Sequence, residues 1–97
     1  MVAKSKETKL QTFTIYSKPA CTYCDQAKAL LESKGIQYDV VNLDVGQPKS
    51  PDSKYISRDD LLAMIPTART MPQIFAHVDS ADQYVGGYLE LKSRLGL

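Results

Sequence analysis

Residues 10–34 read LQTFTIYSKPACTYCDQAKALLESK, and the fold can be worked out from this stretch. Its first eight residues alternate apolar and polar side chains, which predicts a β-strand. After a short loop, the apolar residues recur with the period of an α-helix from Cys21 to Lys34. Cys21 and Cys24 therefore lie at the start of a helix that follows the carboxyl end of a strand.

The rest of the chain predicts one small α/β domain. Further strands are expected at residues 38–44, 73–78 and 83–85, and further helices between Ser57 and Pro66 and over 88–95. Residues 46–56 are predicted to form a loop, and residues 79–82 the turn of an antiparallel hairpin. We expect a four-stranded mixed sheet, made of a parallel pair plus this hairpin and flanked by three helices.

Composition limits the classes of function. The 97 residues carry 12 Lys plus Arg and 11 Asp plus Glu, so the chain has almost no excess of basic residues. This charge balance does not indicate a nucleic-acid partner. The longest apolar run, residues 61–65, is far shorter than the ~20 residues that cross a bilayer. The polar start of the chain has no signal-peptide pattern, which favours a cytoplasmic protein. We expect residues 1–9 to form a mobile tail and residues 10–97 a single domain.

Cys21 and Cys24 are the most informative residues. A disulfide between them closes a very small loop and adds little stability. A zinc site needs about four ligands, whereas the chain has two cysteines and one distant histidine, His77, which we expect at the surface. No metal site is expected, and the Cys-x-x-Cys spacing favours a redox pair over two unrelated cysteines.

The position of each cysteine predicts its role. Disulfide exchange needs a thiolate, and Cys21 lies near the unpaired N–H groups of a helix start, with Lys18 just upstream. Such surroundings lower a cysteine pKa from ~8.5 to about 3.5–7.5. Cys24 is one turn further along, on the apolar face. We therefore expect Cys21 to attack and Cys24 to resolve the mixed disulfide.

Two further stretches allow two readings each. In residues 69–72, RTMP, Pro72 either simply opens a strand in the trans form or follows a cis bond. The cis form would turn the N–H and C=O of Met71 outward, ready for an extended substrate. Gly86 and Gly87 either end a strand or let a ligand approach the backbone at the last helix.

Together these stretches resemble the glutaredoxin family. The resemblance rests on residues 16–24 (YSKPACTYC), 69–75 (RTMPQIF) and 85–88 (VGGY), in the right order, and it covers the chain from about residue 11. The Thr-Met-Pro-Gln sequence and the enlarged middle loop are similar to those of short phage-encoded glutaredoxins.

The resemblance implies a thioredoxin-like fold with a cis Pro72, in which glutathione is the cosubstrate, Cys21 the nucleophile and Cys24 the resolving thiol. It implies a monomeric glutathione-disulfide oxidoreductase that reduces protein disulfides and glutathionylated proteins, with ribonucleotide reductase as a usual acceptor. The implied glutathione-binding residues are Lys18, Tyr23, Arg69, Thr70, Met71, Pro72, Gly87, Tyr88 and Leu89.

The chain departs from the family pattern between the cysteines, where Thr22 replaces the commoner proline, and at Leu89, which offers only its backbone to glutathione. Two alternatives stay open. Some glutaredoxins hold a [2Fe-2S] cluster between two subunits, and the replaced proline is compatible with that activity. A thioredoxin-type disulfide reductase is the other alternative, although that family resembles Trp-Cys-Gly-Pro-Cys and this chain has no tryptophan.

Overall fold

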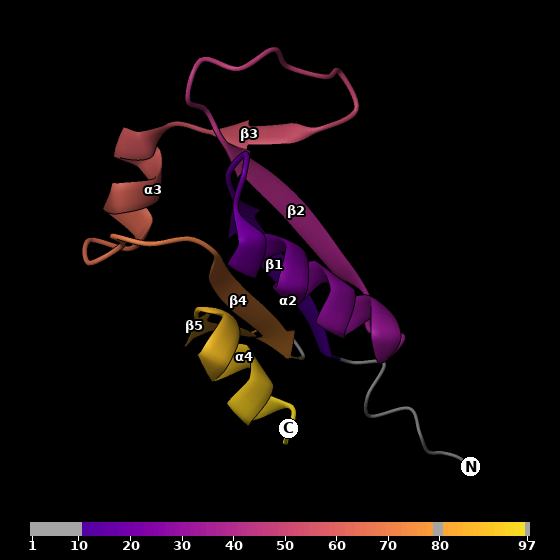
Figure 1. Ribbon diagram of the computed structural model, residues 1–97. Helices are drawn as coiled ribbons and strands as arrows, with labels where there is room; N and C mark the ends of the chain where they lie inside the picture. The colour runs from indigo at the N-terminus through magenta and orange to yellow at the C-terminus, as the bar shows by residue number, and fades with distance from the viewer. Residues whose placement is uncertain (1–10, 79–80, 97) are drawn as a thin grey trace.

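The computed structural model describes residues 11–78 and 81–96, and Figure 1 shows its helices and strands. Within these residues, five strands form one mixed sheet in the order β3-β2-β1-β4-β5. The strands are β1 (Gln11–Ser17), β2 (Tyr38–Leu43), β3 (Lys54–Ile56), β4 (Gln73–Val78) and β5 (Ala81–Gly86). The helices are α2 (Thr22–Ser33), α3 (Arg58–Met64) and α4 (Tyr88–Arg94). Strands β1 and β3 run parallel to β2, whereas β4 is antiparallel to β1 and β5.

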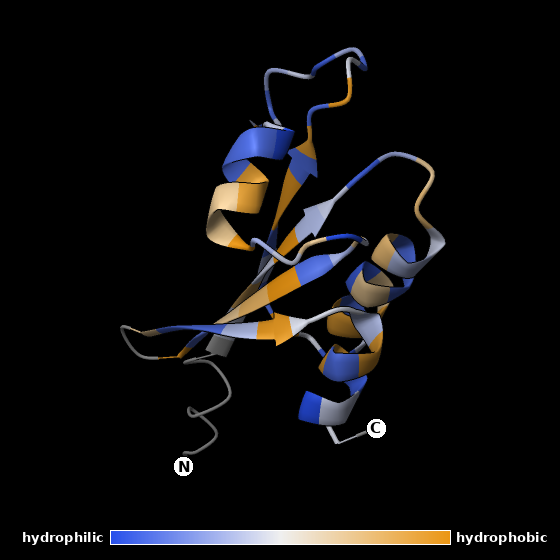
Figure 2. Ribbon diagram, turned by 90° about the vertical axis from the view of Figure 1, so that its left-hand side faces the viewer, coloured by the Kyte–Doolittle hydropathy of each residue, from blue (hydrophilic) through white to orange (hydrophobic). Residues whose placement is uncertain are grey.

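The helices cover both faces of the sheet, with α2 and α4 on one face and α3 on the other (Figure 2). The main core lies under α2 and α4, and its buried residues are Phe13, Ile15, Ala27, Leu31, Ile74, Ala76 and Leu91. A smaller cluster of Leu43, Leu61 and Ile65 lies under α3. None of the helices in the described ranges is long and apolar enough to span a membrane.

The predicted strand, helix and strand at the start of the domain are confirmed. The alternation in β1 buries Phe13 and Ile15 to 1% and 0% exposure, respectively. Helix α2 ends before Gly35, whose φ of +68° is the left-handed conformation that glycine adopts at low cost. The helix predicted between Ser57 and Pro66 is α3, and Ser57 caps it by accepting a hydrogen bond from the Asp60 N–H at 3.0 Å.

The expectation of four strands was wrong, because the predicted loop at residues 46–56 ends in β3. This strand pairs Tyr55 with Asn42 and Ile56 with Leu43, and Ile56 packs on the cluster under α3. The fourth predicted strand was also too short: β5 begins at Ala81, paired with Val78, rather than at residue 83. Residues 79–80 of the predicted turn and the predicted tail at residues 1–9 lie outside the described residues.

Candidate active site

The two cysteines lie at the N-terminus of α2, just after the carboxyl end of the central strand β1. They form a disulfide with their Cα atoms 5.2 Å apart. Cys24 is on the buried face of α2 and is 0% exposed, whereas Cys21 is the N-cap residue and is 7% exposed. Of the two cysteines, Cys21 is therefore the less buried one and the one nearer to an approaching substrate.

Two backbone groups lie near the Cys21 sulfur: an N–H group that favours a negative charge on it and a carbonyl oxygen that opposes one. The Cys24 N–H donates to Cys21 Sγ at 3.1 Å. This donor is one of the helix N–H groups without an intrahelical partner, so it stabilises a thiolate in the reduced protein. The Met71 carbonyl oxygen lies 3.7 Å from the same sulfur. A disulfide sulfur carries no hydrogen to donate, so that contact becomes a hydrogen bond only in a reduced, protonated thiol.

The Met71–Pro72 bond is cis, so the second of the two readings of this segment is confirmed. The segment is held by Gln73, a polar side chain that is only 5% exposed. Gln73 Nε2 donates to the Thr70 carbonyl at 2.7 Å, and the Tyr84 hydroxyl donates to Gln73 Oε1. Both ends of the amide are thus paired, as a buried amide requires. The hydrogen bond to Thr70 fixes the backbone immediately before Met71.

Tyr84 is suited to this donor role. Burial, and secondarily the negative charge of Glu90, raises the pKa of Tyr84 above its usual value of 10.0. The hydroxyl therefore stays protonated at neutral pH and donates to Gln73. The Tyr84 ring also packs edge-on against the Phe75 ring, with 5.5 Å between the ring centroids, and this contact fixes the position of Tyr84 on the sheet.

A groove of about 250 Å³ lies along the Met71–Pro72 segment and the start of α4. We call it the α4 groove, and it is lined by Tyr23, Thr70, Met71, Pro72, Gly87, Tyr88, Leu89 and Glu90. The Tyr23 ring stacks on Tyr88 with 5.9 Å between ring centroids. The Glu90 carboxylate accepts a hydrogen bond from the Gly87 N–H at 2.9 Å, so it neutralises the start of α4 from within the chain.

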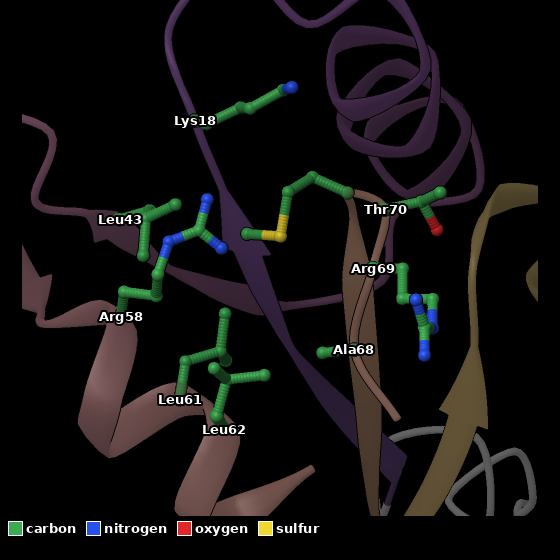
Figure 3. Close-up of a pocket in the computed structure, with 9 residues that line it drawn as sticks. Lys18, Leu43, Arg58, Leu61, Leu62, Ala68, Arg69 and Thr70 are labelled. Atoms are coloured by element: carbon green, nitrogen blue, oxygen red, sulfur yellow. The ribbon is translucent and has the colours of Figure 1, made fainter. Parts of the chain in front are cut away.

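A second, smaller hollow of about 70 Å³ lies toward α3 and shares Thr70 and Met71 with the α4 groove. We call it the α3 hollow, and it is lined by Lys18, Leu43, Arg58, Leu61, Leu62, Ala68, Arg69, Thr70 and Met71. Figure 3 shows the Arg58 guanidinium turned toward the opening on the side of Lys18, whereas the Arg69 guanidinium points away from both. The hollow thus combines an apolar floor with a cationic rim.

The structure brings the nine predicted glutathione-binding residues together, because each of them lines the α4 groove or the α3 hollow. The prediction missed Arg58, Glu90 and Gln73. Arg58 carries no local signal of its own, since only the packing of α3 places it beside Lys18. Glu90 follows the Gly-Gly-Tyr stretch closely and could have been included from the sequence.

His77 lines neither hollow. Its Nε2 lies 2.7 Å from the hydroxyl of Thr14, and its Nδ1 lies 2.6 Å from a carboxylate oxygen of Asp82. These three residues come from β1, β4 and β5, near the end of β4 that is opposite the Met71–Pro72 segment. The imidazole is one-third exposed, in keeping with the expected surface position.

A redox-active pair at the start of a helix, facing a cis-proline segment at the edge of this sheet, defines a disulfide-bearing protein of the thioredoxin-like class. The match to known sequences is narrower. The Glutaredoxin family model matches residues 13–79, and the chain belongs to the glutaredoxin family. Glutaredoxin 3 of Escherichia coli K12 is 36% identical over 73 residues, which cover 75% of this chain and 72% of that protein. A glutaredoxin of Neisseria meningitidis serogroup A is 30% identical over 83 residues, covering 84% and 82%.

Solved structures agree on the fold. Glutaredoxin 1 from Francisella tularensis, crystallised with cacodylate, superposes with a TM-score of 0.63 at 26% identity, covering 88% of this chain and 92% of that one. A buckwheat glutaredoxin–glutathione complex superposes with a TM-score of 0.58 at 24% identity, covering 93% and 74%. The family model that matches is that of glutaredoxin, not that of thioredoxin, the other family considered from the sequence.

Proposed function

We propose that this glutaredoxin is a glutathione-dependent oxidoreductase that reduces protein disulfides and glutathione mixed disulfides as a cytoplasmic monomer. The observation that carries the proposal is the position of Cys21 Sγ. It belongs to the less buried cysteine of the pair, it accepts the Cys24 N–H at 3.1 Å, and it lies beside the Met71 backbone. A nucleophilic thiolate needs this combination of access and hydrogen-bond stabilisation.

The reaction follows from the asymmetry of the pair. The Cys21 thiolate attacks one sulfur of the substrate disulfide, and the other substrate sulfur leaves as a thiolate that takes up a proton. The Cys24 thiolate then attacks Cys21 Sγ, which forms the Cys21–Cys24 disulfide and releases the second substrate thiol. Two glutathione molecules reduce this disulfide and leave as glutathione disulfide. Two electrons thus pass from glutathione to the substrate.

Glutathione fits the two hollows with its cysteine at their shared edge. Its backbone would pair with Met71, next to Cys21. Its glycyl carboxylate would lie in the α3 hollow, where Lys18 and Arg58 supply positive charge. Its γ-glutamyl end would lie in the α4 groove. There the ammonium group can pair with Glu90, while the carboxylate must compete with Glu90 for the Gly87 N–H.

The buckwheat complex supports glutathione as the ligand, because a protein of the same fold forms a complex with it. The weaker point is Leu89, whose apolar side chain is 68% exposed at the γ-glutamyl end. We therefore expect a glutathione affinity that is set chiefly by the α3 hollow and by the Met71 backbone.

Steady-state reduction of a glutathione mixed disulfide tests the proposal, with wild type compared with two serine variants. Cys21→Ser should abolish all activity. Cys24→Ser should retain reduction of the mixed disulfide and lose reduction of a two-cysteine protein disulfide. Retention of both activities in Cys21→Ser would contradict the assignment. Visible absorbance after anaerobic purification would instead indicate the cluster-binding dimer.

A further inference from the structure

Three hydrogen-bonded side chains lie together on the sheet, away from the cysteine pair. Thr14 is on β1, His77 on β4 and Asp82 on β5. The Thr14 hydroxyl oxygen lies 2.7 Å from His77 Nε2, and His77 Nδ1 lies 2.6 Å from Asp82 Oδ1. Phe13 and Ile15 belong to the core under α2 and α4, so Thr14, between them in β1, points to the α3 face of the sheet. The function proposed above uses none of these three side chains.

The chemistry of the three groups fixes the direction of both hydrogen bonds. An ionised carboxylate can only accept, so Nδ1 of His77 carries the hydrogen that it donates to Asp82. In a neutral imidazole the other nitrogen, Nε2, then carries no hydrogen and accepts. The Thr14 hydroxyl is therefore the donor, and its proton is directed at a base that a carboxylate holds in place. A hydroxyl activated as a nucleophile has this arrangement.

The hydrogen-bonded cluster is accessible from solvent and is held by regular strands. The imidazole is 33% exposed, and the Asp82 side chain is 70% exposed. Helix α3 covers one end of this face, and the β4–β5 hairpin, which carries His77 and Asp82, extends beyond the helix (Figure 2). Because three adjacent strands supply the side chains, the register of the sheet fixes their spacing.

Aromatic rings lie beside the Thr14 hydroxyl on the same face. Phe75 is the cross-strand partner of Thr14, and its ring centroid is 6.0 Å from that of Tyr16 and 5.5 Å from that of Tyr84. Burial, and secondarily the negative charge of Asp82, raises the pKa of Tyr16 above its usual 10.0, so the carboxylate acts on this aromatic surface as well. An uncharged aromatic ligand suits these surroundings, whereas an anionic one is repelled.

We infer that Thr14, His77 and Asp82 form an acyl-transfer site, in which the Thr14 hydroxyl takes the acyl group of a neutral activated aryl ester. Oγ1 bonds to the carbonyl carbon while its proton passes to His77 Nε2. The bond from that carbon to the aryl oxygen then breaks, and the aryl oxide takes the proton from the imidazole. No electrons are transferred. The product is an ester of an ordinary alcohol, which is less reactive than an aryl ester, so the acyl group stays on Thr14.

The test uses p-nitrophenyl acetate and the full-length protein in its oxidised form, because the Cys21–Cys24 disulfide leaves no thiolate to compete. The wild type should release about one equivalent of p-nitrophenolate in an initial burst. Mass spectrometry of a protease digest should locate the acetyl group on Thr14. His77→Gln should slow the acetylation of Thr14 by about 100-fold or more, which is the contribution of a general base. Asp82→Asn should slow it less, because the imidazole remains.

Substitutions in β1 identify the nucleophile. Thr14→Val removes the hydroxyl from a side chain of nearly the same shape and should abolish the burst, whereas Thr14→Ser keeps a hydroxyl and should retain it. Thr12→Val is the matched control. Thr12 is on the same face of β1 and is the cross-strand partner of His77, but the imidazole bonds to Thr14, so Thr12→Val should react at the wild-type rate. Circular dichroism confirms that each variant is folded.

Three results would overturn the inference. A burst that persists in folded Thr14→Val would show that the imidazole itself or another group is the nucleophile. Acetyl groups on lysines of the wild type with none on Thr14 would show that the hydroxyl is not activated. An unchanged rate of Thr14 acetylation in His77→Gln would show that the imidazole is not the base. If Thr14→Val does not fold, the second and third results decide. The site is separate from the cysteine pair, so none of these results bears on the proposed function.

Discussion

Replacing Gln73 by leucine tests whether this residue positions the substrate-binding backbone. Gln73 is 5% exposed and connects the Tyr84 hydroxyl to the Thr70 carbonyl, which precedes Met71. Leucine has a similar volume but neither a donor nor an acceptor. The fold should therefore persist, while the backbone at Thr70 and Met71 loses its lateral support.

The magnitude follows from the two hydrogen bonds. Each contributes about 0.5–1.5 kcal/mol, and the groups left behind, the Thr70 carbonyl and the Tyr84 hydroxyl, are on residues that water reaches. Gln73→Leu should lower the free energy of unfolding by about 1–2 kcal/mol. If about 1 kcal/mol of the hydrogen bond to Thr70 supports substrate binding, the KM for a glutathione mixed disulfide rises about fivefold.

Steady-state kinetics separate this role from a purely structural one. We expect the KM to rise while kcat stays within about twofold, because Cys21 itself is untouched. Gln73→Glu keeps the acceptor for Tyr84 but loses the donor to Thr70, so it should raise the KM as Gln73→Leu does. Tyr84→Phe, which keeps the ring packing on Phe75, should have the smallest effect. A destabilised Gln73→Leu protein with an unchanged KM would refute the positioning role.

Two other predictions concern charged side chains. Arg58→Gln should raise the KM for a glutathione mixed disulfide about twofold to fivefold, because it removes a cation from the α3 hollow. The control variant Lys34→Gln removes a cation at the far end of α2 and should leave this KM unchanged. Equal effects of the two variants would contradict the placement of the glycyl carboxylate. Hydrogen bonding from the Gly46 N–H, with the Lys49 ammonium, lowers the pKa of Asp44 below its usual 3.8. The stabilisation by ionised Asp44 is therefore complete above pH 3.8 and is lost as pH falls through the lowered pKa. The free energy of unfolding of Asp44→Asn should be lower than that of the wild type at pH 7, and the two values should converge in strong acid. A difference in the free energy of unfolding that stays constant with pH would contradict this prediction.

The elements that local patterns define were predicted correctly. The period-two alternation of β1 and the cap by Ser57 depend on residues within a few positions of each other, and both are in the structure. By contrast, β3 has three residues, and it exists because Tyr55 and Ile56 pair with β2 across an intervening loop. No periodicity can appear in so short a segment. β5 begins early although Asp82 disfavours strands, because its carboxylate meets His77 on the paired strand.

The residues of the candidate site also fall into two groups, those in short sequence motifs and those placed only by tertiary packing. The cysteines and the segment from Arg69 to Pro72 were selected from the sequence because each lies in a short motif, and the fold then brings the motifs together. Arg58 was not selected, because its place at the rim of the α3 hollow depends on how α3 packs against the sheet. The pairing of Gln73 with Tyr84 likewise joins two strands whose register is a property of the folded sheet.

The central claim is that the start of α2 stabilises the Cys21 thiolate, and the ionisation of this thiol tests it most directly. In Cys24→Ser, Cys21 is the only cysteine of the chain, so the rate of alkylation against pH reports its pKa alone. The Cys24 N–H becomes the N–H of serine and keeps its position as a donor. The account predicts a midpoint within about 3.5–7.5. A midpoint near ~8.5, the value of an unassisted thiol, would contradict it.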